Sequence, residues 1–150
     1  MVLDLKPGTY ALILSCVSNA RIQIGCQGTL ELRPGYYVYL GSALGHGGLR
    51  ARIAHHQKLS LRPHWHIDYL RTHSQIHCIW FSYDVRRREH QWANVMRSVK
   101  GAMIPLLGFG ASDCECRSHL YFFEHCPSRI SFQRGLGRRH AQVEEFKTDK

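Results

Sequence analysis

Long apolar runs are missing from this chain of 150 residues, and acidic side chains are scarce in it. No run of about 18 apolar residues occurs, so the sequence offers no membrane-spanning helix. Near the amino terminus, Asp4 and Pro7 interrupt the chain before an apolar stretch of signal-peptide length develops. We therefore expect a cytoplasmic protein without a membrane partner.

A disulfide framework and a complete zinc motif are also missing. The six cysteines are expected to stay reduced in a cytoplasmic compartment. The one cluster with metal-ligand chemistry is Cys114, Cys116 and His119. A CxC pair is less common than the CxxC knuckle of zinc sites, and the second half of such a site is absent. The pattern weighs against zinc, but a zinc-stabilised adaptor stays open as an alternative.

Length and composition predict one folded domain. A chain of 150 residues can bury one full core but is short for two ordinary domains. Its 44% hydrophobic and 21% charged residues are typical of globular proteins, which argues against disorder. The composition becomes polar and basic from Pro127 onward. We expect the domain to cover residues 1–126, and residues 127–150 to form a basic, peripheral or mobile tail.

The positive charge indicates a polyanionic partner. Lys and Arg number 20 against 11 Asp and Glu, which gives a net charge of +9. Most of the excess lies between residues 50 and 88, where Arg and His side chains can bind phosphate groups. A solvated basic face is the alternative. The predicted nucleic-acid contacts are Arg50, Lys58, Arg62, Arg71, Arg86, Arg87, Arg88, His64 and His66.

Hydrophobic patterning predicts a mixed α/β (α+β) domain. Apolar and β-branched runs favour strands over 8–17, 36–41, 76–82 and 120–123. Alternation across the glycines at 25 and 28 favours a hairpin over 21–32. Helices are predicted over 49–58, over 64–71 and over 85–99, the last with Asp84 as its N-cap.

Two tripeptides and one helix carry a resemblance to a known family. Gly8-Thr9-Tyr10, Tyr39-Leu40-Gly41 and the helical pair Arg52 and His56 occur in this order. The pattern resembles the GIY-YIG nuclease superfamily, whose fold is a small, mostly antiparallel sheet flanked by helices. Here the two tripeptides are separated by the extra β-hairpin.

Stretches 35–43, 64–68 and 108–119 look like a GIY-YIG-related group of prokaryotic domains of unknown function. Members of that group occur alone or fused to DNA-repair endonucleases. The resemblance therefore implies DNA as the partner, structured or damaged DNA included, and an association with DNA-repair enzymes.

The resemblance also implies a site and a reaction. Tyr10, Tyr39, Arg52 and His56 match the catalytic positions, and Glu89 is the carboxylate expected to hold Mg²⁺ or Mn²⁺. Hydrolysis of a phosphodiester needs an activated water and a cation to neutralise charge on the phosphoryl oxygens. A divalent-metal-dependent endonuclease is the expected function. A catalytically silent nucleic-acid binding or targeting module is the alternative.

Overall fold

The computed structural model describes residues 3–59, 62–63, 65–109, 118–137 and 142–147. Its centre is a five-stranded sheet in the order β6-β4-β1-β5-β7, in which every neighbouring pair is antiparallel. A separate two-stranded sheet pairs β2 with β3. The strands are β1 (Gly8–Cys16), β2 (Ala20–Ile24), β3 (Gly28–Leu32), β4 (Gly35–Ala43), β5 (Gln75–Tyr83), β6 (Leu120–Phe123) and β7 (Glu144–Phe146).

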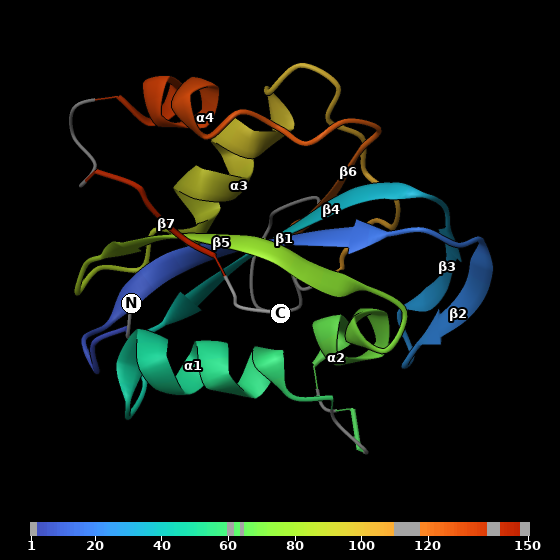
Figure 1. Cartoon of the computed structure of the whole chain (residues 1–150), viewed down its shortest axis with the longest axis horizontal. Coiled ribbons are helices and arrows are strands. Elements are labelled where there is room, and N and C mark those ends of the chain that lie inside the picture. Colours follow the sequence, from blue (N-terminus) through green and yellow to red (C-terminus); the bar gives the residue numbers. More distant parts are fainter. Residues whose placement is uncertain (1–2, 60–61, 64, 110–117, 138–141, 148–150) are drawn as a thin grey trace.

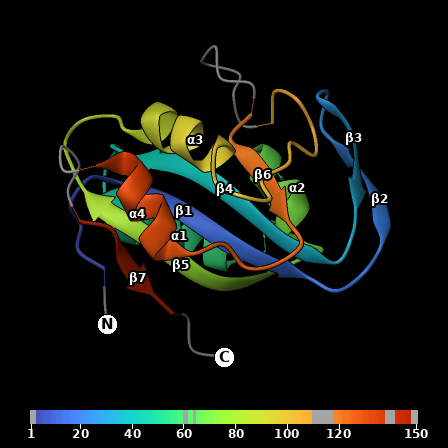
Figure 2. The ribbon, with the colours of Figure 1, turned by 90° about the horizontal axis from the view of Figure 1, so that it is seen from above.

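Among the described residues, four helices cover the two faces of the central sheet. Helices α1 and α2 lie on one face, and α3 and α4 lie on the other (Figure 1; Figure 2). The mixed α/β architecture with a mostly antiparallel sheet is confirmed. The helices are α1 (Gly48–Gln57), α2 (His66–Arg71), α3 (Glu89–Arg97) and α4 (Arg129–Leu136).

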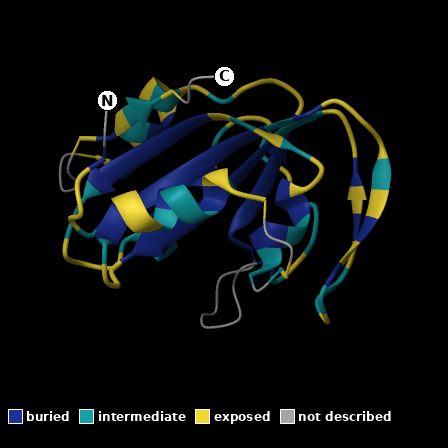
Figure 3. Cartoon of the chain, turned by 60° about the horizontal axis from the view of Figure 1, so that its bottom comes forward, coloured by how far each residue is buried: buried dark blue, intermediate teal, exposed yellow. Residues whose placement is uncertain are grey.

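The central strands are buried on both faces, as their continuous apolar runs predicted. In β1, Tyr10, Leu12 and Leu14 face α1 and α2, while Ala11 and Ile13 face α3 and α4. Figure 3 shows these strands as almost entirely buried. Because successive side chains of a strand point to opposite faces, one run of apolar residues supplies two cores.

The predicted hairpin is present as β2 and β3. Its apolar side chains, among them Ile24 and Leu30, join the core beneath α1 and α2. The turn at Gly25 comes close to the Tyr69 ring of α2. The hairpin therefore extends this core beyond the end of the main sheet (Figure 1).

Helix α3 begins later than the sequence indicated. Asp84 does not cap a helix, because its carboxylate accepts hydrogen bonds from the Arg86 backbone N–H and the Arg88 Nε, both at 2.9 Å. These bonds close a turn over the segment expected to be helical. The helix starts at Glu89, and it buries Trp92 and Met96.

The carboxyl-terminal segment differs from the expected peripheral tail. Helix α4 places Phe132 at 0% exposure against Trp80 and Trp92, and Val143 is also fully buried. Strand β7 then pairs with β5 at the edge of the sheet. The segment packs here because the α3 face of the sheet has apolar surface that α3 alone does not cover, so the folded unit continues past residue 126.

Among the described residues, no helix combines the length and apolar character needed to cross a bilayer.

The packing of α4 predicts a large difference between two substitutions on the same helix. Phe132→Ala should lower the free energy of unfolding by about 3–5 kcal/mol, since it removes a fully buried aromatic ring. Ile130→Ala, at a side chain that is 59% exposed, should change it by less than about 0.5 kcal/mol. Urea denaturation measures both. Equal effects would mean that α4 does not contribute to the core.

Candidate active site

The two motif tyrosines lie on adjacent strands and face the same helices. β1 and β4 pair Tyr10 with Gly41 and Leu12 with Tyr39, and the tyrosine ring centroids are 6.5 Å apart. A Cβ atom at Gly41 would lie 2.4 Å from the Tyr10 hydroxyl. The glycine of the second motif is therefore required by the Tyr10 ring that packs over it.

The glycine of the first motif has a similar role toward α1. A Cβ atom at Gly8 would lie 2.6 Å from Leu49 Cδ1 and 2.4 Å from the Ser82 carbonyl oxygen. Without a side chain at this position, the first turn of α1 can pack directly on β1. The close packing brings the following turns of α1 over the tyrosines.

Helix α1 supplies the hydrogen-bond partner of Tyr10. The Tyr10 hydroxyl and His56 Nε2 are 2.7 Å apart, and both groups are buried. The His56 ring also lies 6.2 Å from the Tyr39 ring between centroids. One imidazole thus contacts both motif tyrosines.

Arg52 lies one helical turn before His56. Its guanidinium donates to the Ser42 carbonyl oxygen at 3.0 Å and lies 4.6 Å from the centre of the Trp65 ring. Residues four apart on a helix share a face, so the Arg52 charge is held beside the Tyr10–His56 pair. Burial raises the pKa of the Tyr10 hydroxyl, and the positive charge of Arg52 opposes that rise.

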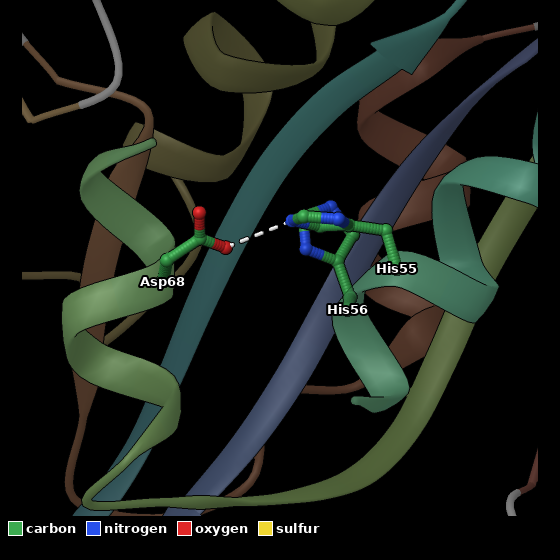
Figure 4. A group of neighbouring side chains, drawn as sticks. All are labelled: His55, His56 and Asp68. Carbon is green, nitrogen blue, oxygen red and sulfur yellow. Dashed lines mark hydrogen bonds and ion pairs between the residues drawn. The ribbon is translucent and has the colours of Figure 1, made fainter. Parts of the chain in front are cut away.

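Helix α2 contributes a carboxylate that faces α1 (Figure 4). Asp68 Oδ1 is 3.0 Å from His55 Nε2, and Asp68 Oδ2 accepts a hydrogen bond from the Trp65 backbone N–H at 2.9 Å. The second bond caps the start of α2 and fixes the carboxylate orientation. Asp68 is only 3% exposed.

Burial dominates the protonation of the central groups. It raises the pKa values of the Tyr10 and Tyr39 hydroxyls well above their usual range, despite the opposing charge of Arg52. Burial lowers the pKa of His56 to about 3, and the neighbouring positive charges of His55 and Arg52 act in the same direction. At neutral pH both tyrosines carry their protons and His56 is neutral.

Glu89 lies at the start of α3 and is electrostatically coupled to the tyrosines. Its negative charge raises the pKa values of both Tyr10 and Tyr39. The carboxylate is nearly buried, and its Oε1 is 2.5 Å from Arg87 Nε. The structure therefore brings together the four predicted catalytic residues and places the charge of the predicted metal ligand within their electrostatic reach.

The predicted phosphate contacts fall into two groups. Arg50, Lys58, Arg62, Arg86 and Arg87 are exposed, and His66 and Arg88 are half-buried. Arg88 is held by Asp84, and the His66 ring lies 5.5 Å from the Phe109 ring between centroids.

Arg71 does not belong to a phosphate-binding face. It is 8% exposed, and it donates to the carbonyl oxygens of His56 at 2.7 Å and Ser74 at 2.6 Å. The side chain ties the end of α1 to the turn after α2. Its role corrects the expectation of a nucleic-acid contact, because these carbonyl oxygens engage its guanidinium inside the protein.

Part of the predicted set lies outside the described residues. This holds for Cys114 and Cys116 of the possible zinc cluster, and for His64. The described member of that cluster, His119, is 3% exposed, and its ring lies 5.9 Å from the His90 ring between centroids.

Three residues of the site are absent from the predicted set. They are His55, Trp65 and Asp68. The spacing between Trp65 and Asp68 is that of an N-cap and its third helical residue, and this signal could have predicted the orientation of the carboxylate.

The profile of the family described as Domain of unknown function DUF123 matches residues 9–142. No curated protein and no solved structure matches the chain. The matched range begins at Thr9, inside the first tyrosine motif, and it includes the second motif and helices α1 to α4.

The lowered pKa of His56 predicts an acid-sensitive fold. Below pH 6.5 an unfolded chain binds a proton at this histidine, whereas the folded protein does not until about pH 3, so stability falls as the pH falls through this window. The wild type should lose about 1–2 kcal/mol from this group between pH 6.5 and about pH 5. His56→Gln, which keeps an acceptor for Tyr10 without a titrating group, should remove that loss.

Urea denaturation at the two pH values measures the effect. His77→Gln, at an exposed histidine on β5, is the matched control and should keep the wild-type acid sensitivity. A His56→Gln variant that loses stability as steeply as the wild type would contradict the assignment.

Proposed function

Because the chain belongs to the Domain of unknown function DUF123 family, whose description assigns no activity, we propose from the site itself that it hydrolyses phosphodiester bonds in DNA with one divalent metal ion. The observation that carries this proposal is the convergence of Tyr10, Tyr39, Arg52 and His56 on one face of the sheet. The likeness of the two tyrosine motifs to those of GIY-YIG nucleases supports it.

Arg52 is suited to bind the scissile phosphate. Its guanidinium has five N–H donors, of which one holds the Ser42 carbonyl oxygen. The Trp65 ring supports the flat guanidinium group and limits its motion. A preorganised cation of this kind stabilises the charge that develops on the phosphoryl oxygens during the attack of water.

Tyr10 and His56 are suited to move one proton. The Tyr10 hydroxyl is protonated at neutral pH, so it can accept a proton from the attacking water only as it gives its own proton to His56 Nε2, 2.7 Å away. Burial disfavours this transfer, because it keeps His56 neutral. An anionic phosphodiester beside the imidazole raises the pKa of His56, because a negative charge favours the imidazolium form.

Glu89 fits one hydrated magnesium ion. Mg²⁺ takes one or two carboxylates and keeps several waters, so a single glutamate is a sufficient protein ligand. The charge of Glu89 acts on both tyrosine hydroxyls, which supports a ligand role for its carboxylate. The ion would supply positive charge to the phosphoryl oxygens, while Arg87 holds one carboxylate oxygen in position.

Replacing Arg52 or Glu89 should separate their roles. Arg52→Ala removes a donor to the phosphoryl oxygens and should lower turnover on the order of a hundredfold or more. Glu89→Gln should abolish metal-dependent cleavage but keep DNA affinity, since it removes a metal ligand and a negative charge. Cleavage of supercoiled, branched and single-stranded DNA with Mg²⁺ or Mn²⁺ is the measurement.

Arg97→Ala and Glu124→Gln change exposed residues outside the site and serve as matched controls. Both should cleave like the wild type. Melting temperatures establish that all four variants are folded. Wild-type protein that cuts none of these substrates, or site variants that cut equally well, would refute the enzymatic proposal.

The exposed cations predict electrostatic binding. Affinity for duplex DNA should fall steeply between about 50 and 200 mM salt and depend little on sequence. Lys58→Ala and Arg86→Ala, at exposed positions, should each reduce the slope of log affinity against log salt by roughly 1. Fluorescence anisotropy measures both quantities.

A flat salt dependence would contradict this binding mode. DNA affinity that falls steeply with salt, in a protein that cleaves no DNA with either metal ion, would instead favour the second candidate. That candidate is a catalytically silent nucleic-acid binding module. The exposed arginines and lysines favour that candidate, since they need no catalysis to bind DNA.

A further inference from the structure

A second group of metal-ligating side chains lies between α1 and α2. His55, His56 and Asp68 each offer a ligand atom, and these atoms lie within 4.8 Å of one another. In Figure 4 the two imidazole rings lie next to each other and face the Asp68 carboxylate. Two imidazoles and one carboxylate are the ligand set of many zinc sites and other transition-metal sites.

One nitrogen atom in this group is buried and has no partner. His56 Nε2 is engaged by the Tyr10 hydroxyl, which leaves Nδ1 as the second ring nitrogen. Within the described part of the chain, Nδ1 has no hydrogen-bond partner, although His56 is only 1% exposed. A buried polar atom without a partner is costly, and a metal ion would satisfy it.

We propose that His55 Nε2, His56 Nδ1 and the Asp68 carboxylate bind a divalent transition-metal ion of the zinc class. This site is separate from the carboxylate of Glu89, which suits a hydrated magnesium ion. It also differs from the cluster of Cys114, Cys116 and His119. The bound ion would keep one or more positions for water or another ligand, as three-ligand zinc sites do.

The neighbouring residues orient the three side chains in a way that suits metal binding. Ligands about 2.1 Å from a tetrahedral zinc ion are about 3.4 Å apart, close to the 3.0 Å between His55 Nε2 and Asp68 Oδ1. The Trp65 backbone N–H orients the carboxylate, and the Trp65 ring packs 4.5 Å from the His55 ring between centroids. The His55 side chain is 39% exposed, which leaves an entry path from solvent.

A simple hydrogen bond between His55 and Asp68 is the competing interpretation. It accounts for the 3.0 Å contact, and it requires no ion. It leaves the buried Nδ1 of His56 without a partner. The metal site accounts for both observations.

Coordination would fix the tautomer of His56. With Nδ1 bound to the ion, Nε2 carries the proton and donates a hydrogen bond to the Tyr10 hydroxyl oxygen. His56 then cannot accept the proton of Tyr10, so the proton transfer proposed above would require that no ion is bound at this site. This consequence rests on the proposed function, whereas metal binding itself does not.

The test is a titration of the chelator-treated full chain with Co²⁺, followed by its visible absorption. The wild type should bind one equivalent of Co²⁺. The bound ion should absorb intensely in the visible range, as Co²⁺ with four or five ligands does, and Zn²⁺ should displace it. His55→Gln and Asp68→Asn should each weaken binding at least tenfold, since each removes a ligand. Asp68→Asn keeps an oxygen that can accept the Trp65 N–H, so the cap of α2 is retained.

His73→Gln, at an exposed histidine beyond α2, is the matched control for histidine number and should bind Co²⁺ like the wild type. Glu89→Gln should also keep the Co²⁺ spectrum, which separates this site from the proposed magnesium site. Zn²⁺ should raise the melting temperature of the wild type and of these two controls, but not that of His55→Gln.

Absence of a Co²⁺ spectrum in the wild type, or equal binding by His55→Gln, would overturn the proposal. Should Asp68→Asn fail to fold, His55→Gln still decides the outcome, since its side chain lies partly in solvent. A protein that binds Co²⁺ through these residues but cleaves no DNA would support the metal site and refute only the nuclease.

Discussion

The hydrogen bond between the Tyr10 hydroxyl and His56 Nε2 joins the central strand of the sheet to the helix that carries Arg52. Both partners are buried, so either group would lose a necessary interaction if α1 moved away. The bond requires space over Gly41 for the tyrosine ring and close packing of Leu49 over Gly8. The two motif glycines are therefore needed for the same contact between helix and sheet that assembles the site.

The charged side chains between α1 and α2, Asp68 and Arg71, each have hydrogen-bond partners. Asp68 contacts His55 and the start of α2, while Arg71 binds the last turn of α1. A charge removed from water needs such partners, because an unpaired buried charge is strongly unfavourable. The same contacts fix the two helices relative to each other, so the groups that hold α1 and α2 together also orient the site.

Burial makes the protonation states of the site conditional on what binds there. The environment keeps Tyr10 and Tyr39 protonated and His56 neutral, which is unfavourable for general-base chemistry in the free protein. A phosphate anion or a metal ion changes these pKa values, because each introduces a charge into a poorly solvated space. Catalysis of this kind would begin only after substrate and metal are bound.

Local patterns in the sequence determined β1, β4, β5 and β6 of the central sheet, the hairpin, and the face shared by Arg52 and His56, but not β7. Apolar runs, the alternation of apolar and polar residues, and helical spacing are all patterns that extend over only a few residues. The order of the motifs along the chain identified the two tyrosines as site residues. Contacts between distant segments decided the rest. Phe132 and Val143 are buried because α4 completes a core that α3 only partly covers. The polar composition of the segment around them gave no local pattern that predicts this burial. Arg71 is internal because it meets the carbonyl oxygen of His56, which lies on another helix. The approach of Asp68 to His55 and His56 likewise depends on how α1 and α2 pack on the sheet, because no local pattern specifies the distance between two helices.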